Sequence, residues 1–281
     1  MNCHTPAASG SRSLATARRL ARRTAKRVVP VAVAAYFIPV AFATYVALGL
    51  IDFARNRRRT LAALDRYFAG NGVFTWLLAP FNLLLDLLCL PYRNRGVYAL
   101  ADLPAPYQDE IKALIEAAHR SDLVGKLQAK MGDRRRGMIF FKWYGKNVQT
   151  SVDVPEFHQR HKYIRTIGVS IFNTRQSTGK HFGPLRVTLR VLYNVNDIAS
   201  DNVYIQVGRH VHRWRADKLF IFDDTLQHKS CNESDEVRYC LFVDILRPSL
   251  IPGVMSGILT VVRVAVARFN AAFYQHWTFI K

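Results

Sequence analysis

The sequence predicts a mainly β domain, a sandwich or a barrel, with flanking helices and an N-terminal membrane segment. Beyond Arg134, short runs rich in β-branched and aromatic residues recur between turn residues, which is the pattern of an all-β domain. A long uncharged run near the N-terminus predicts the membrane segment. The β-rich runs are Met138–Trp143, Tyr163–Phe172, Leu185–Asn194, Val203–Val207, Lys218–Phe222 and Val237–Leu246.

The N-terminal region divides into a basic stretch and an apolar one. Residues 1–27 are small, polar and basic, and we predict that they are disordered. No charge occurs from Val28 to Ile51, and this run exceeds the roughly 20 residues that span a bilayer as a helix. We therefore predict a transmembrane segment over residues 28–52, in which Pro30 and Pro39 allow a kink. A buried helix of a soluble domain is the alternative.

Helical segments are expected on both sides of the β domain. Residues 73–91 are apolar but contain Asp86, and a charge at mid-depth of a bilayer is costly. We expect this segment to lie in the membrane interface or to pack on the domain. An amphipathic helical pattern over 98–127 opens a catalytic domain expected over 98–250. Residues 251–281 are predicted to form a C-terminal amphipathic helix, interfacial or docked on the barrel.

The charge of the chain favours an anionic partner. The formal net charge is +20, from 40 Lys and Arg against 20 Asp and Glu. Basic clusters that flank an apolar run are typical of contacts with an anionic membrane surface. The interleaved aromatics of single-strand nucleic-acid binders are absent from the sequence, so no nucleic acid is expected. The four cysteines form no CxxC pair, which argues against a zinc cluster or a disulfide framework. Nothing in the sequence indicates an oligomeric state.

Two histidines and one arginine carry the predicted chemistry. His181 and His228 each lie at the edge of a predicted strand, and Arg238 follows the second histidine. Imidazole suits ferrous iron, and two histidines leave coordination positions open for a bidentate oxoacid and dioxygen. A buried arginine suits the distal carboxylate of a dicarboxylic cosubstrate, because its planar fork pairs with carboxylate in bidentate fashion.

The residues around these three resemble the aspartyl/asparaginyl β-hydroxylase family of iron and 2-oxoglutarate oxygenases. The resemblance implies a double-stranded β-helix of the jelly-roll or cupin-like type, iron(II), the cosubstrate 2-oxoglutarate, and O2. The matching motifs are the H-x-G-P at His181, the Leu189-Arg190 pair, the run Trp214, Lys218, Phe222, Asp223, Asp224, His228, and the R-x-x-L-x-V-D-x-x-x-P from Arg238 to Pro248.

The resemblance also implies a role for each matching residue. His181 and His228 correspond to the iron ligands, and Arg238 to the residue that pairs with the C5 carboxylate of 2-oxoglutarate. Arg190 corresponds to a second contact with a cosubstrate carboxylate. Ser170 corresponds to a serine that hydrogen-bonds the cosubstrate.

The third ligand position departs from the usual facial triad. Gly183 stands where that triad has Asp or Glu, and the peptide hydroxylases of the family share this glycine. Asp224 is then a candidate carboxylate for orienting a metal-bound water and is counted among the catalytic residues. Glycine at this position also occurs in iron halogenases, but halogenation is the less favoured prediction. Leu192 and Phe172 depart from the family, which has histidine and methionine at these positions.

A looser resemblance extends over more of the chain. The apolar N-terminal segments and the stretch Phe140–Gly145 are similar to the membrane-bound lipid A acyl-chain hydroxylases, with ornithine-lipid hydroxylases as a further branch. The lipid A enzymes have H-x-D where this chain has His181-Phe-Gly. We therefore predict a membrane-associated hydroxylase of a lipid acyl chain, at the bacterial inner membrane with its catalytic domain facing the cytoplasm. A peptidyl aspartyl/asparaginyl hydroxylase, favoured by Gly183, and a non-catalytic membrane scaffold are the alternatives.

Overall fold

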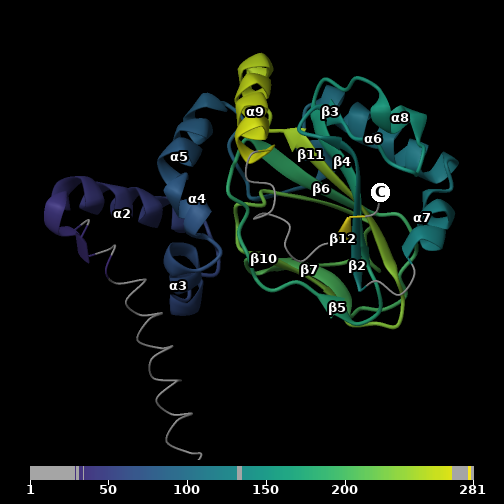
Figure 1. Ribbon diagram of the computed structural model, residues 1–281, viewed down its shortest axis with the longest axis horizontal. Helices are drawn as coiled ribbons and strands as arrows, with labels where there is room; N and C mark the ends of the chain where they lie inside the picture. The colour runs from purple at the N-terminus through teal and green to yellow at the C-terminus, as the bar shows by residue number, and fades with distance from the viewer. Residues whose placement is uncertain (1–28, 30–31, 34, 132–134, 268–277, 280–281) are drawn as a thin grey trace, which may run out of the picture. The chain divides into compact units, whose positions relative to one another are not determined.

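A computed structural model describes residues 29, 32–33, 35–131, 135–267 and 278–279 of the chain (Figure 1). The chain divides into two compact units, residues 1–51 and residues 52–281. The second unit contains all the strands and every residue of the predicted site. The basic stretch over 1–27 lies outside the described residues.

The N-terminal apolar segment differs from its prediction. Helix α2 (Pro39–Phe53) begins at Pro39, directly after a bend at Ile38. Proline fits the first turn of a helix but cannot continue one that precedes it, because it lacks an N–H and clashes with the preceding turn. Within the described ranges, no helix is long and apolar enough to cross a membrane. The transmembrane helix expected over residues 28–52 is therefore not found.

Two sheets form the β domain, which confirms the predicted jelly-roll-like architecture. The larger sheet has eight strands in the order β1-β9-β6-β11-β4-β2-β12, with β3 paired to β2, and the smaller has the order β5-β10-β7-β8. All pairings are antiparallel except β12 with β2. The larger sheet comprises β1 (Val97–Tyr98), β2 (Arg136–Trp143), β3 (Lys146–Asn147), β4 (Ile164–Phe172), β6 (Thr188–Asn194), β9 (Leu219–Phe222), β11 (Arg238–Leu246) and β12 (Thr278–Phe279). The smaller comprises β5 (Gln176–Ser177), β7 (Val203–Val207), β8 (His210–Arg213) and β10 (His228–Asn232).

Each of the six predicted runs contains a strand, but the prediction omitted β8, β10 and the two-residue strands, and β10 matters most because it begins at His228. Its sequence, His-Lys-Ser-Cys-Asn, is polar and lacks a β-branched residue, so the usual strand pattern is missing. Backbone pairing with β7 and β5 holds it in the smaller sheet.

The larger sheet has an apolar outer face and a more polar inner face. Along β11, Tyr239, Leu241 and Val243 lie in the core beneath the helices, whereas Cys240 joins the core between the two sheets. Side chains alternate along a strand, so this register turns Arg238 inward too. The outer face is covered by α6 (Ala105–Arg120), α7 (Leu123–Met131) and α8 (Pro155–His158), and α6 confirms the amphipathic pattern over 98–127 (Figure 1).

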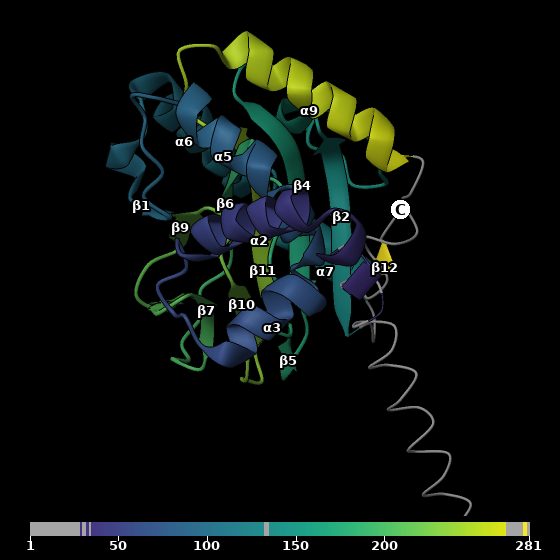
Figure 2. The ribbon, with the colours of Figure 1, turned by 90° about the vertical axis from the view of Figure 1, so that its left-hand side faces the viewer.

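The segment 73–91 packs on the β domain, one of the two outcomes expected for it. It forms α4 (Val73–Leu77) and α5 (Ala79–Leu88), which follow α3 (Leu61–Ala69). Leu85 and Cys89 share a buried cluster with Met255 and Leu259 of α9 (Pro252–Ala267). Helix α9 therefore docks on the barrel beside α5 (Figure 2). The predicted helix over 251–281 extends past α9 into residues 268–277, outside the described part of the chain.

A buried ionic network explains the charge within the apolar segment. Asp86 pairs with Arg186 and Arg247, at 2.6 Å from the Arg186 guanidinium. Arg186 also contacts Asp52, and its Nε lies 3.4 Å from Asp223. These carboxylates compensate the buried guanidiniums, so Asp86 contributes to docking helix α5 on the β domain.

Arg55 completes the network, with three arginines against three aspartates. Its guanidinium lies 2.6 Å from Asp223. Burial opposes ionisation of Asp223, but Arg55 and Arg186 outweigh it and hold the pKa of this carboxyl well below its ordinary value. Asp223 is therefore an anion of the network, and its role differs from that of its neighbour Asp224.

Replacing Arg186 is expected to destabilise the protein severely. Arg186→Leu leaves Asp52 and Asp223 as buried anions with too few partners, a change that costs about 3–5 kcal/mol in the free energy of unfolding. Urea denaturation followed by circular dichroism measures it. Arg215→Leu is the matched control, because its pair with Asp201 is exposed and is expected to contribute less than about 1 kcal/mol. Equal losses in the two variants would contradict a structural role for the network.

Candidate active site

His181 and His228 lie directly opposite each other at the mouth of the barrel. They form an isolated antiparallel bridge, in which each backbone N–H donates to the other's carbonyl at 2.9 Å. Their ring centroids are 4.1 Å apart. A pair of facing residues with a reciprocal backbone bond fixes both imidazoles on one side of the ladder. The two predicted iron ligands, separated along the chain, are therefore brought together.

Both imidazoles are set up to bind a metal through Nε2. The Nδ1 of His181 lies 2.8 Å from the carbonyl of Gly179, and the Nδ1 of His228 lies 2.8 Å from the carbonyl of Leu226. A carbonyl accepts only, so each Nδ1 carries the proton and each Nε2 carries the free lone pair. Burial lowers the pKa of His181, and burial together with His181 lowers the pKa of His228 well below its usual value. The neutral, ligating form therefore persists at neutral pH.

The space of a third ligand at position 183 is taken by Asp224. A Cβ built on Gly183 would lie 2.5 Å from the Asp224 carboxylate carbon, and the Gly183 N–H donates to the Asp224 carbonyl at 2.7 Å. Within the described residues, no His, Cys, Asp or Glu completes a group of three with the histidine pair. The arrangement fits two histidine ligands with a carboxylate nearby, and Asp224 stays a predicted catalytic residue.

A side chain at position 183 is expected to be tolerated only if Asp224 is removed. Gly183→Ala should cost about 1–3 kcal/mol of stability, since the new methyl group overlaps a carboxylate held by Arg190. The double variant Gly183→Ala/Asp224→Gly should recover most of that loss. Thermal unfolding of both variants measures the recovery. Gly179→Ala is the control, because a Cβ there meets nothing within 4 Å. If the double variant lost as much stability as the two single changes together, the new methyl group at position 183 would not overlap the Asp224 carboxylate.

Arg190 is held by two carboxylates of the protein. Its guanidinium lies 2.8 Å from Asp224 and 2.7 Å from Asp244, and its plane covers the Phe242 ring at 3.8 Å. Burial and the carboxylates Asp244 and Asp223 raise the pKa of Asp224 to about 7, although Arg190 opposes the shift. Arg190 therefore orients Asp224, and its predicted contact with the cosubstrate stays a prediction.

Arg238 is a buried cation without a carboxylate partner among the described residues. Its guanidinium donates to the Ser230 hydroxyl at 2.8 Å and lies 4.4 Å from the Phe172 ring centroid and 5.4 Å from that of Trp214. Its Nε makes no hydrogen bond, and neither does the buried Trp214 Nε1. A desolvated charge with spare donors is costly unless an anion joins it, so the site fits the distal carboxylate of a dicarboxylic acid.

Ser170 shares the inner face of the larger sheet with Arg238. It is buried, and its hydroxyl donates a long bond of 3.4 Å to the carbonyl of Cys240, its register partner across β4 and β11. Two pairs further along the ladder, on the same face, Phe172 is the partner of Arg238. Ser170 is therefore within the same wall as Arg238, and its contact with the cosubstrate stays a prediction.

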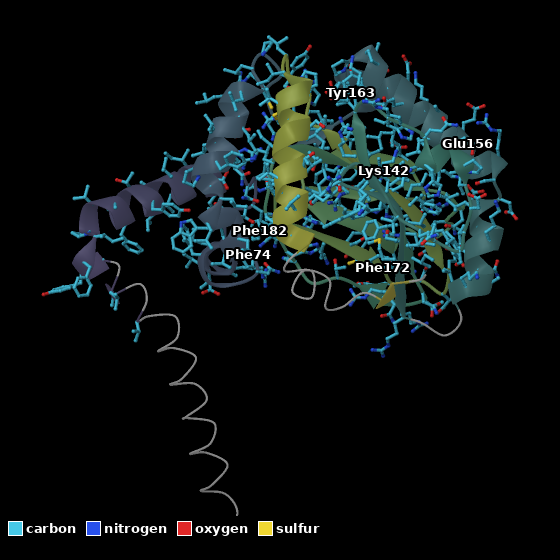
Figure 3. The ribbon with its side chains drawn as sticks, turned by 45° about the horizontal axis from the view of Figure 1, so that its top comes forward. Phe74, Lys142, Glu156, Tyr163, Phe172 and Phe182 are labelled. Carbon is cyan, nitrogen blue, oxygen red and sulfur yellow. The ribbon has the colours of Figure 1, made fainter. Side chains whose placement is uncertain are left out.

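Helices α3 to α5 hold the loop that follows His181, which the sequence did not predict. Thr75 donates to the Gly183 carbonyl at 2.9 Å, and Asn82 donates to the Pro184 carbonyl at 3.1 Å. Phe182, labelled in Figure 3, packs in a cluster with Tyr67, and their ring centroids are 5.5 Å apart. Buried polar residues in an apolar segment were the available signal. Thr75 and Asn82, which lie on helices outside the β sheets, thus hold the backbone that follows His181.

A jelly roll that brings two neutral histidines close together beside a buried arginine has the features expected of a metal-dependent oxygenase. A model of the aspartyl/asparaginyl beta-hydroxylase family matches residues 108–248. The chain belongs to this family. The match includes both histidines, Asp224, Arg190, Ser170 and Arg238.

One curated relative has a described activity. The ornithine lipid ester-linked acyl 2-hydroxylase of Rhizobium tropici is 34% identical over 86 residues, which cover 30% of this chain. The aligned part of the chain spans only 31% of that relative's length.

Solved structures match the chain only at low identity and low TM-score. A 2OG-Fe(II) oxygenase family oxidoreductase from Burkholderia pseudomallei is 14% identical with a TM-score of 0.31, covering 47% of this chain and 80% of its own. The cupin domain of Schizosaccharomyces pombe Cnp3 is 10% identical with a TM-score of 0.26, covering 31% of this chain and 59% of its own.

Proposed function

We propose that the protein is an iron(II)- and 2-oxoglutarate-dependent hydroxylase of a lipid acyl chain that works at a membrane surface. The observation that carries the proposal is the pairing of two neutral histidines with Arg238, a buried guanidinium that lacks an anion. Family membership supports hydroxylation, and the relative from Rhizobium tropici supports a lipid substrate.

The chain's own residues would bind and orient the reactants. His181 and His228 would hold iron through Nε2, and Arg238 with Ser230 would hold the distal carboxylate of 2-oxoglutarate. The bound iron would supply oxygen chemistry in which one atom of O2 enters a C–H bond and the other enters succinate, with release of CO2. Asp224 could hold a proton near neutral pH beside that site. The apolar interior formed by residues such as Phe220 and Phe222 would exclude water.

The outer surfaces of α5 and α9 support work at a membrane. Besides their buried stripe, both helices expose apolar side chains to solvent, and Leu87 is 65% exposed and Val261 69% exposed. A helix that is apolar on both faces requires a second apolar environment. With the net charge of +20, this arrangement suits a protein that lies on an anionic lipid surface.

Lipid mass spectrometry tests the proposal. Purified protein is incubated with Fe(II), 2-oxoglutarate and the total lipid extract of cells that lack the gene. We expect a lipid that gains the mass of one oxygen atom only when iron and 2-oxoglutarate are both present, with succinate formed in equal amount. Failure to bind Fe(II) under anaerobic conditions would favour a non-catalytic scaffold and contradict the proposal.

A peptidyl substrate is the second candidate, and Gly183 favours it because the family's peptide hydroxylases share that residue. Aspartyl and asparaginyl peptides in the same assay separate the two candidates. If the peptide were hydroxylated and the lipid remained unmodified, the substrate would be a peptide and not a lipid.

A further inference from the structure

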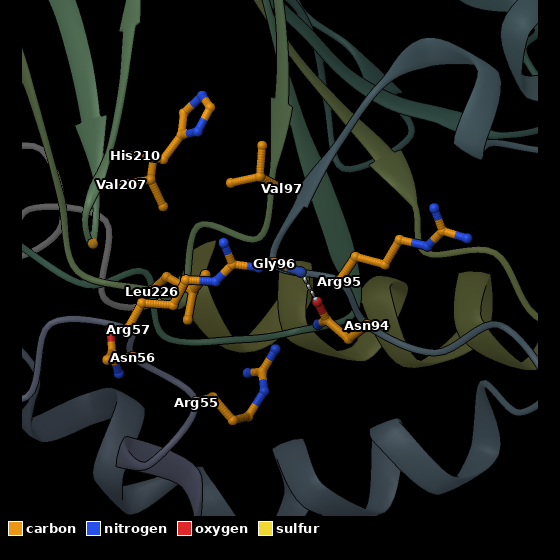
Figure 4. Close-up of a pocket in the computed structure, with 11 residues that line it drawn as sticks. Arg55, Asn56, Arg57, Asn94, Arg95, Gly96, Val97, Val207, His210 and Leu226 are labelled. Carbon is orange, nitrogen blue, oxygen red and sulfur yellow. Dashed lines mark hydrogen bonds between the residues drawn. The ribbon is translucent and has the colours of Figure 1, made fainter.

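A cationic cavity opens at the end of the barrel, beside the loop that precedes His228. Its volume is about 190 Å³, and no acidic residue lines it (Figure 4). The lining includes Arg55, Arg57 and Arg95, together with Val207 and Leu226. A space below about 300 Å³ is small for a whole ligand, so it suits a single group of a larger molecule.

Arg57 supplies uncompensated charge to this cavity. Arg55 pairs with Asp223, and Arg95 pairs with Asp102. Arg57 forms no ion pair with any described carboxylate, whereas the aspartates of the buried network are paired with Arg55, Arg186 and Arg247. In Figure 4 the guanidinium groups of Arg55 and Arg57 point into the cavity, whereas Arg95 extends away from it.

The loop that carries Arg57 passes close to Gly208 and Gln227. Gly208 has a φ of +57°, which favours glycine, and a Cβ built there would touch Arg57 at 3.7 Å. Asn56, the residue before Arg57, accepts a hydrogen bond from the Gln227 N–H at 2.9 Å. The loop that carries the arginine is therefore tied to the residue next to His228.

The cavity and the Arg238 site contact the chain on either side of His228 in the sequence, the first at the turn before β10 and the second within β10. Ser230, the partner of Arg238, follows His228 by two residues, and Leu226, which lines the cavity, precedes it by two. Within β10 two residues of extended chain span about 7 Å, which is the distance along the strand from His228 to Ser230. Neither Arg238 nor Ser230 lines the cavity, so an anion bound there would be a different one from the cosubstrate carboxylate.

We propose that this cavity binds the anionic group of the lipid head, a phosphate or a carboxylate, through Arg57 and Arg55. This inference rests on the proposed function. An anion seated here fixes the polar end of the substrate close to His228. The oxygen atom is therefore inserted on an acyl carbon near the head group, rather than at the far end of the chain.

Steady-state kinetics of Arg57→Gln test the inference. With lipid extract in phosphatidylcholine vesicles, the variant should show an apparent KM for the hydroxylated lipid about tenfold to a hundredfold higher, the loss of one charge-assisted hydrogen bond. The KM for 2-oxoglutarate should not change. Arg57→Lys should recover part of the loss. Arg58→Gln is the matched control, since Arg58 is the next residue and does not line the cavity. An Arg57→Gln variant that matches Arg58→Gln overturns the inference.

Two further measurements separate the source of the anion and the site of hydroxylation. Inorganic phosphate should compete with the lipid for the wild type and should not compete for Arg57→Gln. If the bound anion is a carboxylate, a lipid that has a carboxylate and no phosphate in its head group should show the same rise in KM in Arg57→Gln. Fragmentation of the product should locate the new hydroxyl on a carbon near the head group. A hydroxyl near the chain terminus overturns the inference while leaving lipid hydroxylation intact. Absence of lipid hydroxylation by the wild type would instead contradict the proposed function.

Discussion

Replacing His228 by alanine is expected to abolish iron binding and oxygen-dependent turnover. His228 presents one of two imidazole Nε2 atoms, and no other described His, Cys, Asp or Glu stands close enough to make a group of three with the pair. Loss of a residue that merely orients a ligand typically costs 10–100-fold in metal affinity, so loss of a ligand should cost more than about a hundredfold. Anaerobic titration with Fe(II) and succinate formation measure the two effects.

The controls for His228 separate metal binding from folding. His228→Gln keeps most of the buried volume and removes the imidazole, so it should fold with nearly the wild-type melting temperature and still fail to bind iron. His119→Ala removes an exposed histidine on the outer helix α6, which contacts Tyr193, and should leave iron binding unchanged. Full turnover by His228→Gln would show that the histidine pair is not the metal site.

The histidine pair and Arg238 were predictable because they stand in a recognisable motif, but their physical setting was not. The sequence identifies polar residues at strand edges. Register decides which of them face inward, and register depends on pairing between distant strands, as for Ser170 with Cys240. Arg190 illustrates the limit. Its place between Asp224 and Asp244 follows from the pairing of β6 with β9 and with β11, which no local pattern encodes.

The apolar N-terminal segments show a second limit. Hydropathy alone cannot distinguish a membrane span from a helix that packs on a domain, because both bury apolar side chains. Asp86 was the informative residue in segment 73–91, since a charge there requires a partner. Its partners, Arg186 and Arg247, lie about a hundred residues or more further along the chain, so the network could not be derived from the segment itself.

Replacing Arg238 by methionine is expected to have opposite effects on function and on stability without ligand. The buried guanidinium lacks a described carboxylate partner, and burial lowers the pKa of Arg238. Its bond to Ser230 and its contacts with the Phe172 and Trp214 rings offset only part of the desolvation cost. Arg238→Met should therefore unfold with a free energy equal to the wild type or higher by about 1–4 kcal/mol, the range seen when buried ion pairs are replaced by apolar residues.

The addition of 2-oxoglutarate should reverse that order. A ligand at a hundred times its Kd stabilises the folded state by about 2.7 kcal/mol, so the wild type should gain this amount and Arg238→Met should gain none. Chemical denaturation with and without 2-oxoglutarate, in the presence of Fe(II), measures the gain. Arg209→Met makes the same change on an exposed turn and should behave as the wild type in both conditions. If Arg238→Met gained as much stability as the wild type, the cosubstrate carboxylate would have to bind elsewhere. If only Arg238→Met lost the stabilisation by 2-oxoglutarate, the role of the buried guanidinium would be cosubstrate binding. Folding without ligand does not require this charge.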